Sequence, residues 1–360
     1  MKYIDEYRDT KLCLSLAERI RAISKKPLNI MEVCGGHTMS IRKNGIQKMV
    51  GKHIKFISGP GCPVCVTAIS DIDKAIKLAE NKNTVICTFG DLFNVPGSIS
   101  SLAKERASGA DVRVVYSAHD ALEFSKIEPS RRFVFLGIGF ETTAPTVAAS
   151  ILEAAKENVD NYFVLALNKT MPGALRAVLD DKDSKVNALI LPGHVSAITG
   201  LGMYSFLKDD LKISGCVSGF EPADMLSAVY ILVEAHEAGR VILENAYRRA
   251  VKDEGNTKAL GIMNEVFEPC HVEWRGIGMI PGSGLKIKNK YEKFDADKNF
   301  NVTVTRSKEN KACLCGEILR GAKTPADCKL FGKACTPENP MGACMVSSEG
   351  TCAAWFRYSE

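Results

Sequence analysis

The segment FVFLGIGFETTAPTVAASILEAAKENVDNYFVLAL, residues 133–167, contains the pattern that decides the fold. Its two ends, 133–138 and 163–167, are short apolar runs without polar alternation, which is typical of strands buried on both faces. Residues 146–157, between them, show the helical spacing of apolar side chains. A strand, a helix and a second strand in this order form a βαβ unit and predict a parallel sheet covered by helices.

The same alternation extends in both directions, from residue 28 to about residue 213. Further strands are predicted at 28–33, 54–58, 84–88, 113–116 and 188–191. Helices are predicted at 70–81 and 101–108, and a long helix at about 224–251. The number of strands allows two such sheets.

The domain organisation follows from these patterns. Helical spacing of apolar residues predicts an N-terminal helix within 1–27. Because residues 125–132 are polar and contain a proline, we place a boundary there, between α/β domain I at 28–130 and α/β domain II at 131–305. Residues 306–360 form a cysteine-rich region. The expected fold class is α/β, with two parallel-sheet βαβ domains plus a cysteine-rich C-terminal iron–sulfur region.

Composition and charge exclude several classes of protein. The 360 residues carry 47 basic and 42 acidic side chains, without a block of Lys and Arg, so the charge gives no support for nucleic-acid binding. Charged residues occur throughout the first twenty positions, and the longest apolar runs are far shorter than a bilayer span. We therefore expect a cytoplasmic protein without signal peptide, membrane segment or nucleic-acid partner.

Cysteine is the unusual component, with 13 residues of which six fall in the last fifty positions. Thiols in a reducing compartment indicate metal or redox chemistry before structural disulfides. The C-terminal spacing is Cys313-x-Cys315-x12-Cys328-x6-Cys335-x8-Cys344-x7-Cys352. This segment has too little apolar periodicity to build a core, so four of its thiolates can hold an iron–sulfur cluster that stabilises it. A zinc site is the alternative. The remaining isolated thiols, outside the motifs below, are expected to be packing residues: Cys13, Cys87, Cys216 and Cys270.

Five unusual motifs share one kind of position, where an apolar run gives way to a predicted helix. They are Cys34-Gly-Gly-His37-Thr38, Gly59-Pro-Gly-Cys62-Pro-Val-Cys65, Gly139-Phe-Glu141-Thr-Thr-Ala-Pro145, Pro192-Gly-His194-Val-Ser196 and Gly219-Phe-Glu221-Pro-Ala-Asp224. In an open parallel sheet, ligands bind outside the carboxyl ends of the strands, where such loops gather. The five motifs together therefore predict a site.

Cys62 and Cys65 form a Cys-x-x-Cys pair entering a helix, and they can close as a disulfide or chelate one metal ion. Cys34 precedes two glycines and His37, which can act as a base or a metal partner. Thiolates favour iron, zinc or copper(I), so Cys34, Cys62 and Cys65 form a plausible soft-metal site. Buried structural thiols and a thioredoxin-like dithiol are the alternatives.

The acidic and imidazole side chains of the other three motifs have two interpretations. Glu141, His194, Glu221 and Asp224 can line the predicted site. Equally, carboxylates near a helix N-terminus are favourable as caps and through the helix dipole, with no chemistry required.

Taken together, these motifs resemble the HypD family of hydrogenase maturation factors over essentially the whole chain. The resemblance rests on CGGHT at 34–38, GPGCPVC at 59–65, GFETTAP at 139–145, PGHVS at 192–196, GFEPAD at 219–224 and the tail from CLCGEILRG to CMVSSEGTCAAW. The cysteine positions of the family are all present.

The resemblance implies two α/β domains and a third region that holds a [4Fe–4S] cluster. It further implies a scaffold and redox factor, partly enzymatic, on which the Fe(CN)2CO unit of [NiFe]-hydrogenases is assembled. The implied partners are the small chaperone HypC, HypE (itself loaded by HypF) as the source of cyanide, and the hydrogenase large subunit through HypC.

Residue roles are implied by the same resemblance. Iron of the nascent unit is expected at Cys34, with Cys62 and Cys65 close by and His37 as a hydrogen-bonding neighbour. Glu141, His194, Glu221 and Asp224 are expected to line the cleft. The expected cluster ligands are Cys315, Cys328, Cys335 and Cys352, with Cys313 and Cys344 left as a dithiol pair. Cys313 in place of Cys315 is nearly as reasonable.

Two other functions fit parts of the pattern. A thioredoxin-reductase-like dithiol oxidoreductase with a [4Fe–4S] cluster would use the same Cys-x-x-Cys pair, but it needs no third thiol at Cys34. A zinc-stapled α/β binding protein would be colourless, whereas an iron–sulfur protein is brown.

Overall fold

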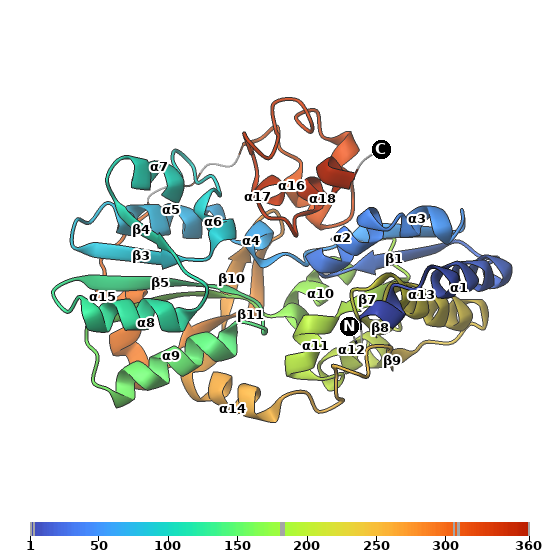
Figure 1. Ribbon diagram of the computed structural model, residues 1–360, viewed down its shortest axis with the longest axis horizontal. Helices are drawn as coiled ribbons and strands as arrows, with labels where there is room; N and C mark the ends of the chain where they lie inside the picture. Colours follow the sequence, from blue (N-terminus) through green and yellow to red (C-terminus); the bar gives the residue numbers. More distant parts are fainter. Residues whose placement is uncertain (1, 3, 181–183, 305–306, 308–309, 359–360) are drawn as a thin grey trace.

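The computed structural model describes residues 2, 4–180, 184–304, 307 and 310–358. It is a mixed α/β structure with two parallel sheets and a cysteine-rich C-terminal region, as the sequence predicts (Figure 1). No helix of the described residues is long and apolar enough to cross a membrane.

The first sheet has five strands in the order β2-β1-β7-β8-β9, and all neighbouring strands are parallel. Its strands are β1 (Leu28–Glu32), β2 (Ile54–Ser58), β7 (Ala188–Pro192), β8 (Ser214–Ser218) and β9 (Leu243–Asn245). Every residue of β7 and β8 is buried, which explains the apolar sequence of β7 and the small residues of β8.

The second sheet has four parallel strands in the order β4-β3-β5-β6. They are β3 (Thr84–Thr88), β4 (Asp111–Val114), β5 (Arg132–Gly139) and β6 (Tyr162–Asn168). Strands β5 and β6, with the helix between them, are the βαβ unit predicted from residues 133–167. They pair from Phe133↔Tyr162 to Gly139↔Asn168.

Each sheet combines parts of both predicted α/β domains. In the second sheet Thr84 of β3 pairs with Arg132 of β5, across the expected boundary at residue 131. In the first sheet Ile30 of β1 pairs with Ala188 of β7. The chain therefore starts the first sheet, builds all of the second, and returns to complete the first. Local hydrophobic patterns identify strands, but they do not specify the distant strands with which each one pairs.

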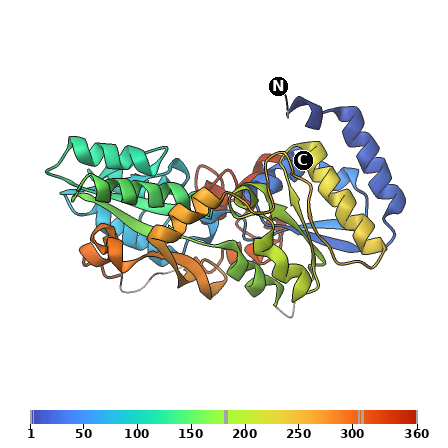
Figure 2. The same cartoon turned by 90° about the horizontal axis from the view of Figure 1, so that it is seen from below.

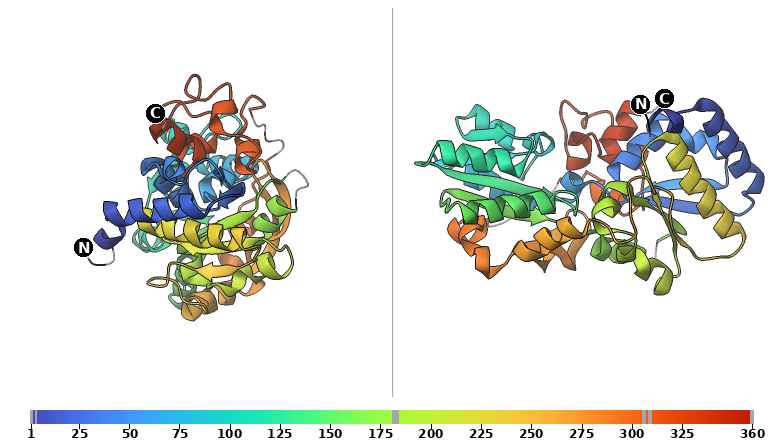
Figure 3. Two further views of the ribbon diagram at one scale, coloured as in Figure 1. Left: turned by 90° about the vertical axis from the view of Figure 1, so that its right-hand side faces the viewer. Right: turned by 60° about the horizontal axis from the view of Figure 1, so that its bottom comes forward.

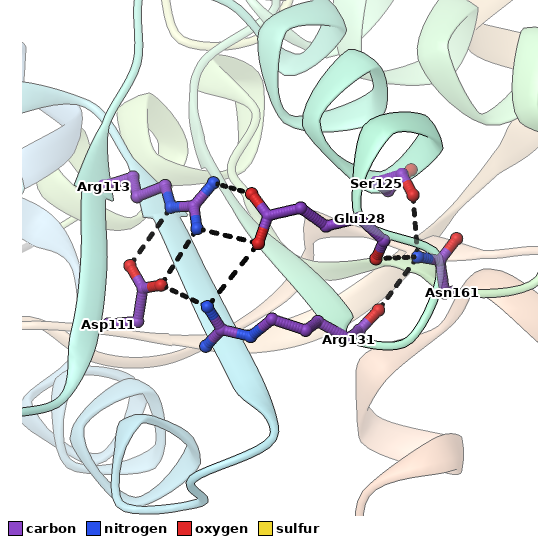
Figure 4. Close-up of polar contacts among 6 residues, drawn as sticks. All are labelled: Asp111, Arg113, Ser125, Glu128, Arg131 and Asn161. Atoms are coloured by element: carbon purple, nitrogen blue, oxygen red, sulfur yellow. Dashed lines mark hydrogen bonds and ion pairs between the residues drawn. The ribbon is translucent and has the colours of Figure 1, made fainter.

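The polar segment at 125–132 is a fixed turn within the second sheet (Figure 4). Arg113 forms ion pairs with Asp111 and Glu128, and Arg131 also reaches Asp111, at 2.6 Å. The Asn161 side-chain amide donates to the carbonyl oxygens of Ser125 and Arg131, each at 2.8 Å. Polar composition here reflects ion pairing at the surface of one sheet, which a sequence does not distinguish from a linker.

Helices cover both sheets. In the first half of the chain they are α1 (Thr10–Ile23), α2 (Gly35–Lys43), α3 (Ile46–Met49), α4 (Pro63–Val66), α5 (Ile69–Ala79), α6 (Gly90–Phe93), α7 (Leu102–Ala107), α8 (Ala118–Ile127), α9 (Ala144–Lys156) and α10 (Met171–Leu179). The later ones are α11 (Gly193–Thr199), α12 (Ser205–Asp209), α13 (Pro222–Glu237), α14 (Thr257–Val266), α15 (Ala296–Asn299), α16 (Cys315–Leu319), α17 (Ala343–Val346) and α18 (Thr351–Tyr358). Short 3-10 turns are η1 (Asp5–Tyr7), η2 (Gly202–Tyr204), η3 (Asn289–Phe294) and η4 (Pro325–Asp327). The predicted helices at 70–81, 101–108 and 146–157 are confirmed, and α1 and α13 lie side by side against the first sheet (Figures 2 and 3).

The predicted long helix at 224–251 is wrong beyond its first half. Helix α13 ends at Glu237, and Gly239 adopts a positive φ of 66°, a conformation that terminates helices. The apolar residues that follow form β9, in which Leu243 pairs with Gly215 of β8. Their apolar side chains therefore belong to the edge strand of the first sheet and not to a helix.

A hairpin that no sequence pattern predicts follows α14. Strands β10 (Phe267–Trp274) and β11 (Gly278–Ile287) are antiparallel, with an irregularity between Cys270 and Val272. Lys169, directly after β6, forms an isolated bridge with Gly284 of β11, so the hairpin is attached to the end of the second sheet. Each strand contains a proline, and β11 also contains three glycines, which hides the alternation on which strand prediction relies.

Candidate functional site

Both sheets place their unusual loops at the ends where ligands bind in open α/β folds. The strand order reverses between β1 and β7 in the first sheet and between β3 and β5 in the second. CGGHT follows β1 and PGHVS follows β7, while GFETTAP follows β5. Helix α4, with the Cys-x-x-Cys pair, lies between the two lobes, and the cysteine-rich segment lies above it (Figure 1).

The two cysteine loops of the first sheet are in direct contact. The Gly35 amide donates to the Gly61 carbonyl oxygen at 3.2 Å. A Cβ atom at Gly61 would lie 2.2 Å from the backbone nitrogen of Cys34, so only glycine allows this approach. The contact brings the Cys34 loop and the Cys62–Cys65 loop together, as predicted.

Cys34 is a buried thiol at the start of α2, with 7% of its surface exposed. Burial is the main cause that raises the pKa of Cys34 to about 12, and the nearby Glu349 carboxylate adds to the effect. The backbone amides of Gly36 and His37 point at the sulfur and oppose this shift. The thiol is therefore protonated on its own, but its surroundings supply donors for the thiolate that a metal ion would create.

His37 is buried and neutral. Its Nε2 lies 3.2 Å from the carbonyl oxygen of Ser218, which can only accept, so we assign the proton to Nε2. Burial lowers the pKa of His37 to about 4. The other ring nitrogen, Nδ1, is left with a lone pair and without a hydrogen-bond partner. An acceptor or metal ligand is thus available three residues after Cys34.

The GFEPAD motif packs its aromatic ring between two of the predicted site residues. Phe220 stacks on His37 at 4.7 Å and on His194 at 4.0 Å between ring centroids. His194 is therefore joined to the Cys34 loop through Phe220, and one part of its ring stays exposed.

Glu221 and Asp224 are held by arginines. Glu221 accepts two hydrogen bonds from the guanidinium group of Arg8, at 2.5 and 2.8 Å. Asp224 accepts two from the guanidinium group of Arg249, both at 2.6 Å. The two acids also form a capping box at the start of α13. The structure thus places them in the structural role that local sequence allowed, and both are at the edge of the site.

Cys62 and Cys65 are joined by a disulfide. Cys62 is the N-cap of α4, and its sulfur accepts a hydrogen bond from the Cys65 amide at 3.2 Å. In this oxidised form neither sulfur is a thiolate ligand. The site therefore combines one free thiol, Cys34, with one disulfide.

Glu141 is buried on the loop after β5 of the second sheet. Its Oε1 accepts a hydrogen bond from the Met171 amide at 2.8 Å, whereas its Oε2 has no partner. Burial raises the pKa of Glu141 to about 7. Burial raises the pKa of Tyr204, and Glu141 and Cys34 both add to this shift, so the carboxyl group and the thiol both lie near this phenol.

Glu32 is a site residue that sequence reasoning missed. It ends β1 with 1% of its surface exposed, and it accepts a hydrogen bond of 2.6 Å from the Thr38 hydroxyl. Its Oε2 has no partner, and burial raises the pKa of Glu32 to about 8. The available signal was a single acid at the end of a mostly apolar strand, two residues before Cys34.

The C-terminal segment reaches into the site. A Cβ atom at Gly35 would lie 2.3 Å from the carbonyl oxygen of Glu349, so the two backbones touch. The Ser347 hydroxyl donates to Asp91, after β3, at 2.7 Å. Residues between the last two cysteines therefore contact the loops of both sheets.

All six C-terminal cysteines line one small cavity, which we call the cysteine cavity. They are Cys313, Cys315, Cys328, Cys335, Cys344 and Cys352. Apolar side chains, among them Ile318, Leu330 and Phe331, form the rest of its wall. The sulfurs of Cys315 and Cys344 are 2.7 Å apart. Hydrogen bonds from Cys313 and Cys344 are the main causes that lower the pKa of Cys315.

The donor set of the cysteine cavity fits a cluster better than one zinc ion. Tetrahedral zinc at about 2.3 Å would hold its thiolates about 3.8 Å apart. Within the described ranges, only one group of three His, Cys, Asp or Glu ligand atoms lies within 4.8 Å of one another. It consists of His119, Glu123 and Glu153 rather than of cysteines, and Lys126 already pairs with both of its acids. The Cys335 sulfur accepts a hydrogen bond from the Met341 amide, as sulfurs around iron–sulfur groups do. The four-plus-two division of these cysteines is not visible, since all six share the cavity.

The fold and the site define a class of protein: an α/β protein with two parallel sheets and a cysteine-rich C-terminal region whose thiols are compatible with metal binding. The family model of HypD, described as the hydrogenase formation hypA family, matches residues 11–359. The chain belongs to the HypD family.

Related proteins match over nearly their full lengths. The chain is 45% identical to hydrogenase maturation factor HypD2 of Bradyrhizobium diazoefficiens over 368 residues, covering 99% of this chain and 97% of the relative. It is 43% identical to hydrogenase maturation factor HypD of Rhodobacter capsulatus, with 99% and 98% covered. For HypD of Escherichia coli K12 the identity is 40%, with 100% and 99% covered.

Proposed function

We propose that this chain is a scaffold and redox factor in [NiFe]-hydrogenase maturation, on which the Fe(CN)2CO unit is assembled. The observation that carries the proposal is the contact between the Cys34 loop and the Cys62–Cys65 loop at the ligand-binding end of the first sheet. One buried thiol beside one disulfide provides a soft ligand and a two-electron reservoir in the same place. Membership of the HypD family supports the same reading.

Iron of the nascent unit is the substrate, and Cys34 is its proposed ligand. Low-spin iron carrying cyanide and carbonyl favours soft thiolate donors. The amides of Gly36 and His37 would stabilise the bound thiolate, and the free Nδ1 of His37 can accept a proton or orient a ligand. Glu141 and His194 are proposed to line the space that partners enter, while the ion pairs of Glu221 and Asp224 support α13 behind Phe220.

The Cys62–Cys65 pair is proposed to supply electrons for cyanide transfer in its dithiol form, which releases two electrons and two protons as the disulfide forms. Two single-electron transfers from the iron–sulfur group, with uptake of two protons, would restore the two thiols. The reduced pair would then add two sulfurs beside Cys34, as the initial soft-metal hypothesis requires. Glu32, whose backbone carbonyl accepts a hydrogen bond from Gly59 of the Cys62–Cys65 loop, and Glu141 have raised pKa values and are proposed to hold protons at neutral pH.

We propose that the cysteine cavity holds a [4Fe–4S] cluster, with Cys315, Cys328, Cys335 and Cys352 as ligands and Cys313 and Cys344 as a dithiol pair. Cys313 remains an alternative to Cys315. When bound, the cluster would exchange single electrons. The protein's own part is to exclude water through Leu330 and Phe331 and to donate backbone hydrogen bonds to sulfur.

The proposed partners are a HypC-type small chaperone, HypE as the cyanide donor, and the hydrogenase large subunit through HypC. We place the process in the cytoplasm. The loops of both sheets and the segment at Ser347–Glu349 meet at the site, so a partner that reaches Cys34 would contact both lobes.

Infrared spectroscopy tests the proposal. The chain is co-purified without oxygen together with its small partner, and bands are sought in the cyanide and carbonyl stretching region. We expect the bands in the unmodified protein and in Cys87→Ala, a buried thiol of β3, and their loss in Cys34→Ala. Unchanged bands in Cys34→Ala would show that the iron is bound elsewhere.

A second candidate function is a thioredoxin-reductase-like dithiol oxidoreductase, which the Cys62–Cys65 disulfide near the cysteine cavity favours. Such an enzyme does not require the Cys34 thiol. Full hydrogenase maturation by Cys34→Ala in cells, together with its loss in Cys62→Ser, would favour this alternative over the scaffold.

A further inference from the structure

The turn of the β10–β11 hairpin lies between the disulfide helix and the first helix of the cysteine cavity. Thr67, directly after α4, forms an antiparallel bridge with Trp274. The Arg275 amide donates to the carbonyl oxygen of Val66 at 2.9 Å. Figure 1 shows β10 rising between the two lobes toward α4. The hairpin turn is therefore bonded to the segment that carries Cys62 and Cys65.

The other side of the turn touches α16 through two glycines. Gly276 has a positive φ of 72°, and a Cβ atom there would lie 2.2 Å from the Cα of Gly316. A Cβ atom at Gly316 would in turn lie 2.7 Å from the Cα of Gly276. The two backbones can approach this closely only because both residues lack side chains. Arg275 and Cys315 each directly precede one of the contacting glycines.

The hairpin turn is rigid. Trp274 is fully buried, its indole nitrogen donates to the Ser283 hydroxyl at 2.8 Å, and its ring stacks on Phe140. The ammonium group of Lys169 donates to the carbonyl oxygen of Glu273 at 2.8 Å. These contacts of the two preceding residues fix the backbone position of Arg275.

Arg275 brings a positive charge to this junction, with only 6% of its surface exposed. Because Arg275 directly precedes Gly276 and Cys315 directly precedes Gly316, the backbone contact of the two glycines keeps this charge near Cys315. Charges in a buried, weakly polar environment interact more strongly than charges in water.

We propose that Arg275 is a positioning residue that raises the one-electron reduction potential of the iron–sulfur group in the cysteine cavity. The inference rests on the proposed function for the presence of that group. Reduction adds one electron to the group, neither making nor breaking a bond to the protein, and a fixed positive charge stabilises the more negative, reduced form. The hairpin turn holds this charge between the cysteine cavity and the disulfide.

The test is a redox titration of the full chain, purified without oxygen, in which dithionite is the reductant and the electron paramagnetic resonance signal of the reduced group is followed. Arg275→Gln removes the charge and keeps a hydrogen-bonding side chain. We expect its midpoint to fall by about 59 mV, which corresponds to a tenfold change in the one-electron equilibrium constant. The iron and sulfide content per chain should stay unchanged.

Arg320→Gln is the matched control. Arg320 ends α16, in the same segment, but its side chain is exposed, so solvent and salt screen its charge. We expect the midpoint of this variant to equal that of the unmodified chain. Arg275→Lys, which keeps the charge, should retain most of the original midpoint.

Each outcome decides the inference. An unchanged midpoint in Arg275→Gln with normal iron content overturns it and leaves the proposed function standing. If Arg275→Gln loses its iron, Arg275→Lys decides: a normal iron content and midpoint support the charge role, whereas loss of iron there too overturns it. Absence of any iron–sulfur signal in the unmodified chain overturns both the inference and the proposed cluster.

Discussion

At the residue scale, burial keeps the side chains next to Cys34 uncharged by shifting their pKa values in opposite directions. Burial lowers the pKa of the imidazole of His37 and raises the pKa of the Glu32 carboxyl, so both are neutral at pH 7. Each retains one polar atom without a partner, Nδ1 of His37 and Oε2 of Glu32. Unpaired buried polar atoms cost stability, and they are typical of sites that act on a ligand.

Glu32 should make the stability of the metal-free protein depend on pH. The unfolded carboxyl loses its proton near its ordinary pKa of 4.5, whereas the folded one keeps it to about 8. Between these values the unfolded state binds fewer protons, so the free energy of unfolding falls as pH rises. We expect Glu32→Gln to reduce this slope by up to about 1.4 kcal/mol for each pH unit between pH 5 and 8. Denaturant titrations measure it, and Glu18→Gln, an exposed acid on α1, should leave the slope unchanged. Equal slopes in Glu32→Gln and the unmodified chain would contradict the raised pKa.

Cys62→Ser should abolish hydrogenase maturation in cells and leave intact the visible absorbance of the iron–sulfur group proposed in the cysteine cavity. The substitution removes the disulfide, but a serine hydroxyl can replace the sulfur as N-cap of α4, so the helix should persist. Cys270→Ser, at a half-buried thiol of β10, is the control and should mature hydrogenase normally. If Cys62→Ser also loses this visible absorbance, the assignment of the Cys62–Cys65 pair and the cysteine cavity to separate functions is wrong.

At the element scale, backbone contacts between loops assemble the site. The Cys34 loop, the loop at Gly61 and the segment at Glu349 approach one another where glycines remove the side chains. These elements come from three distant parts of the chain. Their close approach therefore depends on how the first sheet and the cysteine-rich segment are folded, rather than on local conformational propensity.

Gly61→Ala should separate the two cysteine loops. The added Cβ would lie 2.2 Å from the Cys34 backbone nitrogen, and backbone atoms on both sides cannot move without displacing β1 or α4. We expect a loss of about 1–3 kcal/mol in the free energy of unfolding and loss of the cyanide and carbonyl infrared bands. Gly261→Ala on α14 is the matched control, because nothing lies within 4 Å of its added Cβ, and it should be neutral or stabilising. Full retention of the bands in Gly61→Ala would show that the loop contact is dispensable.

At the scale of the whole molecule, the cysteine-rich segment connects the lobes. Ser347 bonds to Asp91 of the second sheet, while Glu349 contacts Gly35 of the first. Its helices are short, at four to eight residues in α16, α17 and α18, so the bound group rather than local packing would hold it together.

Removal of iron by a chelator should therefore loosen this segment before either sheet. We expect limited proteolysis of the stripped protein to begin between residues 310 and 358, at least tenfold faster than in the loaded protein. Mass spectrometry identifies the first cut, and the Cys13→Ser variant should behave like the unmodified chain. A first cut within β3, β5 or β7 would contradict this order of stability.

The sequence by itself determined the α/β class, the strands β1 to β7, several of the helices, the grouping of the cysteines and the motifs at strand ends. Those features depend on short-range periodicity and on residue chemistry, which a linear chain displays directly. Only the tertiary structure decided which strands share a sheet, because a pairing such as Ile30 with Ala188 depends on how apolar surfaces far apart in the chain are buried against one another. It also assigned Glu221 and Asp224 to ion pairs with Arg8 and Arg249, and it revealed Glu32 and Arg275. The roles of these four residues depend on burial and on partners brought in from elsewhere, and neither is encoded within a few positions of the residue itself.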